Sequence, residues 1–288
     1  MPMDRQDPDQ GAQRRRGVLL SLRHFLLAIQ FFTRIPVTGR LADWVGYSPA
    51  MLRASAAHFP GIGWLAALLA AGVYGGLHWA LAPNPFAPAV AAVLSTVATV
   101  LMTGGFHEDG LADVADGLGG SAQRERALDI MKDSRIGTYG AIALVLAVLA
   151  KISLLVLLAQ IHPQWVLVAL FAAHVSSRYM PLWLIRCLAH VGDTAQSKSK
   201  PLADSISRTG LWVGGVWWLL AMGLCALVFP WQALLAGALA AALAALFMGW
   251  RLHKRLQGYT GDGLGATQQL SEIAFYLGLC LAASAAPS

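Results

Sequence analysis

The sequence has little charge. Its 288 residues include 21 Lys and Arg and 15 Asp and Glu, so 12% are charged, about half of the roughly 25% usual in soluble domains. Hydrophobic residues make up 57%. A soluble fold of this size lacks the polar side chains to cover its surface, which excludes an ordinary cytosolic enzyme, a disordered chain and a coiled coil. The composition predicts a polytopic membrane protein.

Cysteine is also scarce. Cys187, Cys225 and Cys280 lie far apart in apolar stretches without a CxxC pair, which excludes a disulfide framework and a zinc site. The net charge is +6, but no basic stripe with interleaved aromatic residues accompanies it, so no nucleic-acid partner is expected. In a membrane protein, an excess of Lys and Arg reflects topology. The expected surroundings are the lipid bilayer.

Several stretches are long and apolar enough to cross a bilayer, because about 20 apolar residues span its ~30 Å core. These seven predicted spans are residues 59–82, 85–104, 137–160, 164–187, 210–229, 231–250 and 269–286. Residues 1–16 are expected to be a disordered basic cytosolic tail, and 17–35 an amphipathic helix at the membrane surface. We therefore expect an all-α polytopic helical bundle, with residues 17–288 as a single membrane-embedded domain.

Short and long connections alternate between these spans. The short turns carry no Lys or Arg, whereas most basic residues lie in the amino-terminal region or in and beside the long polar loops. These loops are 36–58, 105–136, 188–209 and 251–268. By the positive-inside rule, the long loops and the amino terminus face the cytoplasm.

Acidic residues concentrate in the loop 105–136. Asp109, Asp113 and Asp116 are spaced i, i+4 and i+7, which places them on one helical face. Like charges there repel unless a cation lies between them, and oxygen ligands without Cys favour Mg²⁺ or Mn²⁺. The pattern predicts a metal site at these three residues, which are also candidate catalytic residues together with the neighbouring His107. The alternative is a solvated acidic helix face.

A second cluster follows in the same loop. Asp129 and Asp133 again share a face at i, i+4 and are further candidate metal ligands. Lys132 and Arg135 can bind phosphate oxygens, Arg in bidentate fashion. The alternative for these two cations is ordinary anchoring on the positive side of the membrane.

Near the carboxyl end, residues 258–266 place four glycines around one Asp. Because a glycine-rich backbone can approach a phosphate or a metal closely, Gly261, Asp262 and Gly263 are candidate phosphate-binding residues. The alternative is a plain turn. If all the long loops share one side of the membrane, this loop and the acidic loop can converge on one site.

Ionisable residues also interrupt the apolar segments, where they are functional candidates by default. Arg178 either lines a cavity, as a further substrate-binding residue, or snorkels to the surface. His174 shares a helix face with it at i, i+4. Lys151 is expected to pair with an acid or a carbonyl, and Glu272 lies in the last apolar segment.

Two long motifs, TGGFHEDGLADVADGL (103–118) and RALDIMKDSRIGTYG (126–140), resemble the cobalamin synthase family, also called adenosylcobinamide-GDP ribazoletransferases. FFTRIPV (31–37), FPGIGWLAALLA (59–70) and GYTGDGLGA (258–266) are similar to that family and occur in the expected order. A departure is Glu108, where the family pattern has an apolar residue.

The resemblance implies a Mg²⁺-dependent transferase of the bacterial inner membrane with its active site facing the cytoplasm. Its substrates would be adenosylcobinamide-GDP and α-ribazole, or α-ribazole 5′-phosphate, with release of GMP. A homo-oligomer, or a complex with other corrinoid-pathway enzymes, is compatible with this interpretation.

Two other classes stay open. One is a CDP-alcohol phosphotransferase, although no Arg follows Asp109-Gly110 at the distance that this class requires. The other is a cation-coupled transporter, although its carboxylates would belong near the bilayer midplane rather than in a loop.

Overall fold

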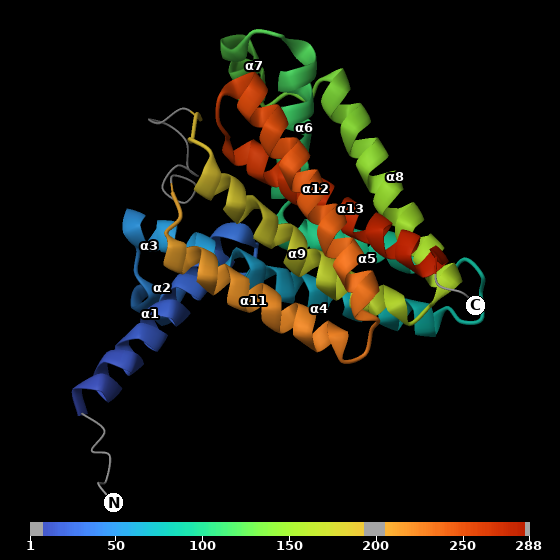
Figure 1. The fold of residues 1–288 in the computed structure, drawn as a ribbon, viewed down its shortest axis with the longest axis horizontal. Coiled ribbons are helices and arrows are strands. Elements are labelled where there is room, and N and C mark those ends of the chain that lie inside the picture. The colour runs from blue at the N-terminus through green and yellow to red at the C-terminus, as the bar shows by residue number, and fades with distance from the viewer. Residues whose placement is uncertain (1–7, 193–204, 286–288) are drawn as a thin grey trace, which may run out of the picture.

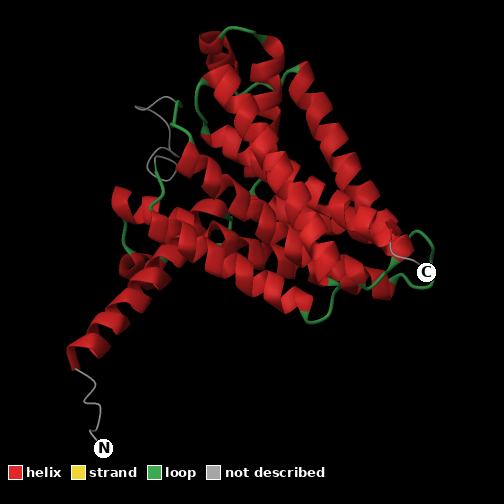
Figure 2. Cartoon of the chain, viewed as in Figure 1, coloured by secondary structure: helices red, strands yellow, loops and turns green. Residues whose placement is uncertain are grey.

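The computed structural model describes residues 8–192 and 205–285. Within these ranges the chain is helical and has no strand (Figure 2); one isolated bridge pairs His190 with Tyr259. The helices are α1 (Pro8–Phe32), α2 (Gly39–Val45), α3 (Pro49–Ser55), the 3₁₀ turn η1 (Ala56–His58), α4 (Phe59–Ala80), α5 (Ala87–Thr103), α6 (Phe106–Gly120), α7 (Arg124–Met131), α8 (Thr138–Ile161), α9 (Trp165–Cys187), α11 (Arg208–Ala226), α12 (Trp231–Leu256) and α13 (Gly261–Ala285). The expected all-α fold is confirmed.

Helices α9 and α13 form the centre of the bundle. α13 packs against α6, α8, α9 and α12, and α9 packs against α4, α11 and α13 (Figure 1). Small residues make these approaches close: a Cβ on Gly278 of α13 would lie 2.6 Å from the carbonyl oxygen of Ala236 on α12. Tight packing of backbones through small residues is the usual way in which helices associate in a membrane.

Helices cover all seven predicted spans, but fewer of them qualify as spans by length and hydropathy. Among the described residues, four do: Pro49–Ala80, Thr138–Ile161, Arg208–Ala226 and Trp231–Leu256. The bent pair α5 and α6 would make a fifth. The number seven is therefore not confirmed. α9 and α13 fall short because their polar side chains face the protein interior, where hydropathy says little about lipid contact.

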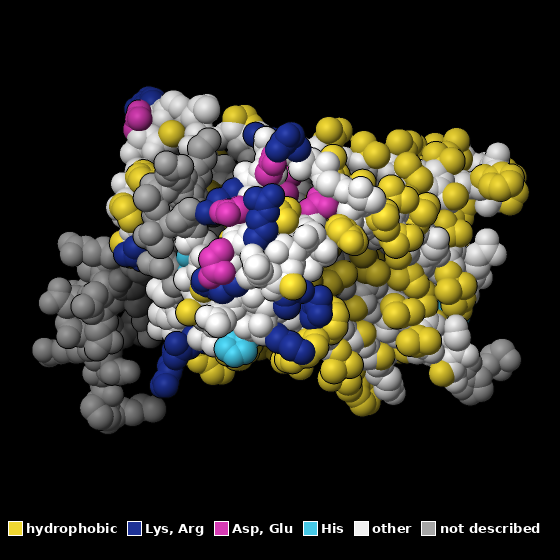
Figure 3. All heavy atoms as spheres, turned by 90° about the horizontal axis from the view of Figure 1, so that it is seen from above, with side chains coloured by type: hydrophobic (Ala, Val, Ile, Leu, Met, Phe, Trp, Pro, Cys, Tyr) yellow, Lys and Arg dark blue, Asp and Glu magenta, His cyan; other side chains and the backbone are white. Residues whose placement is uncertain are grey.

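The surface separates into a polar and an apolar part. Charged side chains gather toward one end of the view from above, and hydrophobic side chains cover the other end (Figure 3). The exposed apolar side chains include Val145 and Leu149 of α8, Leu219 and Leu220 of α11, and Leu243 of α12. An apolar surface this large fits a protein whose outer helices contact lipid.

The amino-terminal helix is longer than the sequence predicts. α1 begins at Pro8, so residues 8–16 are helical rather than disordered, while residues 1–7 lie outside the described part. Pro is well suited to a first helical turn, and Ala, Gln and Arg favour helix, so the apolar helix after Gly17 extends backwards. Its first turns project from the bundle (Figure 1), and Val18 and Leu19 are exposed.

The alternation of loops gives a topology that can be tested. A reporter fused after Ala82 or Ile161 is expected on the periplasmic side and one at Gly120 on the cytoplasmic side, because Lys and Arg lie in the long loops. Paired alkaline phosphatase and fluorescent-protein fusions measure this. A periplasmic Gly120 would contradict both the topology and the proposed side of the site.

Candidate active site

A sharp bend places α6 across the end of α5. Gly104 and Gly105 have φ angles of 71° and 72°, a left-handed conformation that side chains with a Cβ disfavour. The two helices meet at 90° across this break. The expected helical face exists as part of α6, because Asp109, Asp113 and Asp116 all lie within it.

Beside this bend lies a cleft of about 660 Å³. Its acidic lining is Glu108, Asp109 and Asp113. The end of α1 and the residues after it supply another wall, and the segment leading into α8 supplies a third. The remaining lining residues are Gln30, Phe31, Thr33, Arg34, Thr103, Gly104, Gly105, Phe106, Ala112, Ser134, Ile136 and Leu144.

The glycine-rich loop converges on α6, as the sequence predicts. A Cβ on Gly110 would lie 2.8 Å from the backbone oxygen of Asp262, and one on Gly265 would lie 3.3 Å from the Cα of His107. Glycines on both helices therefore allow the start of α13 to lie directly against α6. Thr260 caps α13 by accepting a 3.1 Å hydrogen bond from the backbone N–H of Gly263, which fixes the loop.

The carboxylates at this junction repel one another. Burial and the negative charges of Asp262, Asp109 and Asp116 raise the pKa of Asp113 to about 7. Burial and Asp109 raise the pKa of Asp262 to about 6. Both residues lie outside the four candidate spans. Asp109, Asp113 and Asp262 thus form a cluster of like charges that a bound cation would stabilise.

The donor set of this cluster suits a hard cation. Carboxylate oxygens without thiolate or imidazole partners match Mg²⁺ chemistry, and Mg²⁺ keeps several waters and substrate oxygens besides one or two carboxylates. In the part of the chain that the structure describes, no group of three or more His, Cys, Asp or Glu side chains is arranged to hold a metal ion by itself. A site built from few protein ligands and completed by substrate therefore fits better than a closed metal cage.

The carboxylate of Asp116 is bonded to the start of α8 and does not line the cleft. Its two carboxylate oxygens accept hydrogen bonds from the backbone N–H groups of Gly137, at 2.7 Å, and Gly140, at 2.8 Å. These groups belong to the first turn of α8, whose unpaired N–H donors and positive dipole favour a carboxylate. A Cβ on either glycine would collide with Asp116. The structure thus gives Asp116 a role in holding α8 against α6.

We expect Asp116→Asn to destabilise the protein by about 1–3 kcal/mol, because its amide replaces one acceptor with a donor that faces a buried N–H. Thermal unfolding in detergent, followed by Trp fluorescence, measures the change in Tm. Glu125→Gln on exposed α7 is the matched control and should leave Tm unchanged. An unchanged Tm for Asp116→Asn would return this residue to the candidate metal ligands.

The second acidic cluster does not line the cleft. Asp133 is paired with Arg135 by a 2.6 Å contact to Nη2 and a 3.0 Å contact to Nε, and this pairing lowers the pKa of Asp133 to about 2. Asp129 is exposed and lies 3.9 Å from Lys132. The cleft is instead bordered by Ser134 between them. The charges of this second cluster therefore pair with one another at the rim of the cleft.

The remaining candidate residues occupy different places. His107 is buried, stacks on Phe59 with ring centroids 5.6 Å apart, and has no hydrogen-bond partner for Nε2. Gly261 joins it in lining a small apolar cavity. The N–H of Gly263 is already bonded to Thr260. Arg178 is buried rather than snorkelling, and does not line the cleft.

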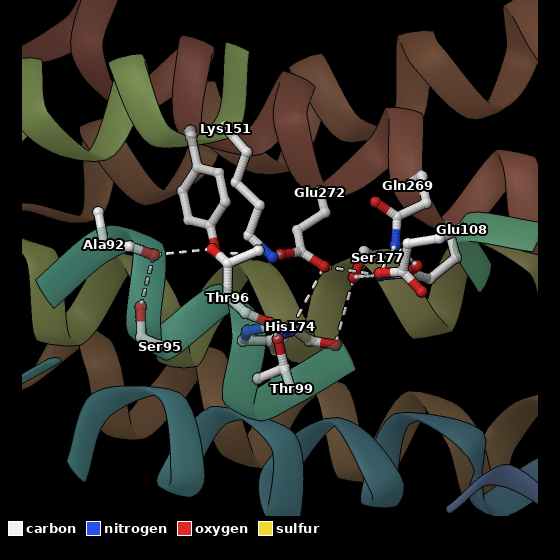
Figure 4. Close-up of polar contacts among 12 residues, drawn as sticks. Ala92, Ser95, Thr96, Thr99, Glu108, Lys151, His174, Ser177, Gln269 and Glu272 are labelled. Carbon is white, nitrogen blue, oxygen red and sulfur yellow. Dashed lines mark hydrogen bonds and ion pairs between the residues drawn. The ribbon is translucent and has the colours of Figure 1, made fainter. Parts of the chain in front are cut away.

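A polar network crosses the bundle interior behind the cleft (Figure 4). Glu272 of α13 accepts from Lys151 of α8 at 2.5 Å, which confirms the expectation that Lys151 pairs with an acid. His174 Nδ1 lies 3.4 Å from Glu272 and 3.1 Å from Nη1 of Arg178, as their i, i+4 spacing predicts. Gln268 donates to Glu272 at 2.7 Å.

This network reaches the cleft through two amides. The Nε2 of Gln269 donates to the Oε1 of Gln268 at 3.0 Å and to the Oε1 of Glu108 at 2.9 Å. Glu108, the departure from the family pattern, thus connects the interior to the cleft, while its Oε2 is buried without a partner. Neither glutamine was predicted from the sequence, and nor was the cleft residue Arg34. For Arg34, the available signal was an arginine that follows an apolar helix in FFTRIPV.

These features define a class: an integral membrane helical protein with a carboxylate-lined cleft where its helices meet their longer loops. The comparisons with known proteins are specific. The family described as cobalamin-5-phosphate synthase matches residues 24–280, and this chain belongs to that family. It is accordingly an enzyme, a transferase of cobalamin biosynthesis.

Curated relatives extend over nearly the whole chain. A protein of Polaromonas sp. is 58% identical over 274 residues, which cover 90% of this chain and 97% of the relative. One from Polaromonas naphthalenivorans is 55% identical, covering 92% and 99%. One from Leptothrix cholodnii is 47% identical, covering 89% and 94%. All three are named adenosylcobinamide-GDP ribazoletransferase. No solved structure matches.

Proposed function

We propose that this enzyme transfers the adenosylcobinamide-phosphate group of adenosylcobinamide-GDP to α-ribazole, or to α-ribazole 5′-phosphate, and releases GMP. The names of its relatives supply the substrates. The observation that carries the proposal is the cleft itself, where Glu108, Asp109 and Asp113 face a space large enough for a nucleoside diphosphate group.

The reaction is an in-line displacement at phosphorus. A hydroxyl oxygen of α-ribazole forms a bond to the phosphorus that bears the corrinoid, and the bond from that phosphorus to the oxygen of GMP breaks. The hydroxyl proton passes to a carboxylate of the cleft, and GMP leaves with the bonding electron pair. Such a displacement depends mainly on positioning and on neutralising charge.

Asp109, Asp113 and Asp262 repel one another, and one or two of them would hold the Mg²⁺ together with oxygens of the substrate. When bound, the ion neutralises the diphosphate and makes GMP a better leaving group. Asp116 positions α8, and with it the wall of the cleft that contains Ile136 and Leu144. We further propose that the cleft faces the cytoplasm of a bacterial inner membrane, because the basic loops adjoin it.

The test is GMP release by the purified protein in nanodiscs. Release is expected only with adenosylcobinamide-GDP, an acceptor and Mg²⁺ together, and running α-ribazole and its 5′-phosphate in parallel identifies the acceptor. CDP-diacylglycerol with an alcohol should yield no CMP. Absence of GMP under all these conditions would refute the proposed reaction.

A further inference from the structure

Arg34 lies in the first residues after α1, where the backbone is firmly held. Its N–H donates to the carbonyl of Met102 in the last turn of α5 at 2.7 Å. The hydroxyl of the preceding Thr33 donates to Ile29 at 2.7 Å and accepts from the N–H of Ile35 at 3.1 Å. Although its side chain is exposed, Arg34 therefore starts from a fixed point on the wall of the cleft.

The guanidinium of Arg34 rests on the bend between α5 and α6. A Cβ on Gly104 would overlap its Nε and lie 2.8 Å from its Cζ and its Nη2. Gly104 also has a positive φ, so this glycine both makes the bend and leaves room for the guanidinium. Because both Arg34 and Gly104 line the cleft, this contact places the guanidinium at the cleft wall.

Arg34 is the one cation among the described residues that line the cleft, whose lining also includes three carboxylates. No ion pair joins it to any carboxylate of the described chain. Arg135 at the rim, by contrast, is engaged by Asp133 at 2.6 Å. A guanidinium in the cleft wall that forms no ion pair with the carboxylates of the same cleft is available to bind an anion there.

We propose that Arg34 is a catalytic residue that binds the diphosphate of the nucleotide-activated substrate, on the opposite side from the carboxylate cluster. A planar guanidinium donates two parallel hydrogen bonds to phosphate oxygens. Charge developing on the departing GMP phosphate strengthens these bonds as the phosphorus–oxygen bond breaks. This inference rests on the proposed function and adds the residue that holds its leaving group.

The experiment compares Arg34→Gln, Arg34→Lys and wild type in nanodiscs, with Arg40→Gln on exposed α2 as a control outside the cleft. Calorimetry with GDP and Mg²⁺ measures binding of the nucleotide end. Arg34→Gln is expected to weaken the affinity for GDP about 10- to 100-fold, which corresponds to the loss of one hydrogen bond to a charged group. The affinity of Arg34→Lys for GDP should lie between those of wild type and Arg34→Gln, since Lys keeps the charge but cannot donate two parallel hydrogen bonds. Arg40→Gln should bind like wild type.

Steady-state kinetics separates this role from others. Arg34→Gln should raise KM for adenosylcobinamide-GDP and lower kcat, with KM for α-ribazole unchanged and Tm within one degree or so of wild type. Three results would overturn the inference. The first is a wild-type affinity for GDP in Arg34→Gln, and the second is a raised KM for α-ribazole in place of a raised KM for adenosylcobinamide-GDP. The third is a lowered Tm in both Arg34→Gln and Arg34→Lys. The KM values require an active wild type, so failure of the proposed function itself shows separately, as no GMP release from wild type.

Discussion

Replacing Asp113 with Asn is expected to reduce GMP release about 10²- to 10³-fold, the usual cost of removing one charge-stabilising group from a phosphoryl-transfer or acyl-transfer site. Asp113 lines the cleft and lies close to Asp109 and Asp262, so its charge contributes directly to the proposed cation site. Asn keeps the size of the side chain and removes the charge. Turnover at saturating Mg²⁺ measures the effect.

The same substitution should leave stability intact or improve it. In the folded protein the pKa of Asp113 is raised from its ordinary 3.8 to about 7, so its ionised form disfavours folding. This penalty is fully present above pH 7 and disappears as the pH falls toward 3.8. In EDTA, Asp113→Asn should therefore unfold at a Tm equal to or above that of wild type at pH 8, with a smaller difference at pH 5.

A surface variant completes this comparison. Asp43→Asn makes the same chemical change on exposed α2 and should alter neither rate nor Tm. If Asp113→Asn kept the wild-type rate and Mg²⁺ dependence, the acidic face of α6 would be merely solvated. If it lost activity together with Tm, the residue would be structural rather than part of the site.

The largest stability effect is expected in the interior. Glu272 is 1% exposed and compensates the buried ammonium of Lys151 at 2.5 Å. Glu272→Met leaves that cation unpaired, and removing one partner of a buried ion pair costs about 3–5 kcal/mol. It also takes an acceptor from Gln268 and from Tyr276, whose hydroxyl donates to Glu272 at 3.3 Å. Thermal unfolding in detergent should show a marked fall in Tm.

The double variant Lys151→Met with Glu272→Met should recover much of that loss. Replacing a whole buried pair with apolar side chains of similar length is often neutral, because neither charge stays uncompensated. Glu108 remains as an anion near Arg178. A double variant less stable than Glu272→Met alone would mean that the hydrogen bonds to the glutamate, rather than the charge pair, stabilise the bundle.

Local pattern predicted much of this architecture. Apolar runs predicted the position of every long helix, and helical spacing correctly paired His174 with Arg178. The acidic loop contains the expected helix, since Asp109, Asp113 and Asp116 all lie in α6. The approach of Asp262 to α6 followed from a topological argument about loops on one side of the membrane.

Local sequence pattern could not predict contacts between segments that lie far apart in the chain. Spacing assigned Asp116 to the metal cluster, but its oxygens bond to Gly137 and Gly140, and nothing within α6 indicates where those N–H groups lie. Arg34 was missed because its importance depends on the bend at Gly104, 70 residues further along the chain.

Helix α8 connects the chemistry of the cleft to the thickness of the bilayer. It has 24 residues, hence a length of about 36 Å, which exceeds a hydrocarbon core of ~30 Å and allows it to span with some tilt. Few of its side chains are buried, and α5, α6 and α13 pack against it on one side and set its angle. Its first turn is fastened to Asp116, beside the cleft wall at Ile136. We therefore expect a bilayer of different thickness to change the angle of α8 about this fastened end and to move the cleft wall, so that turnover depends on lipid chain length.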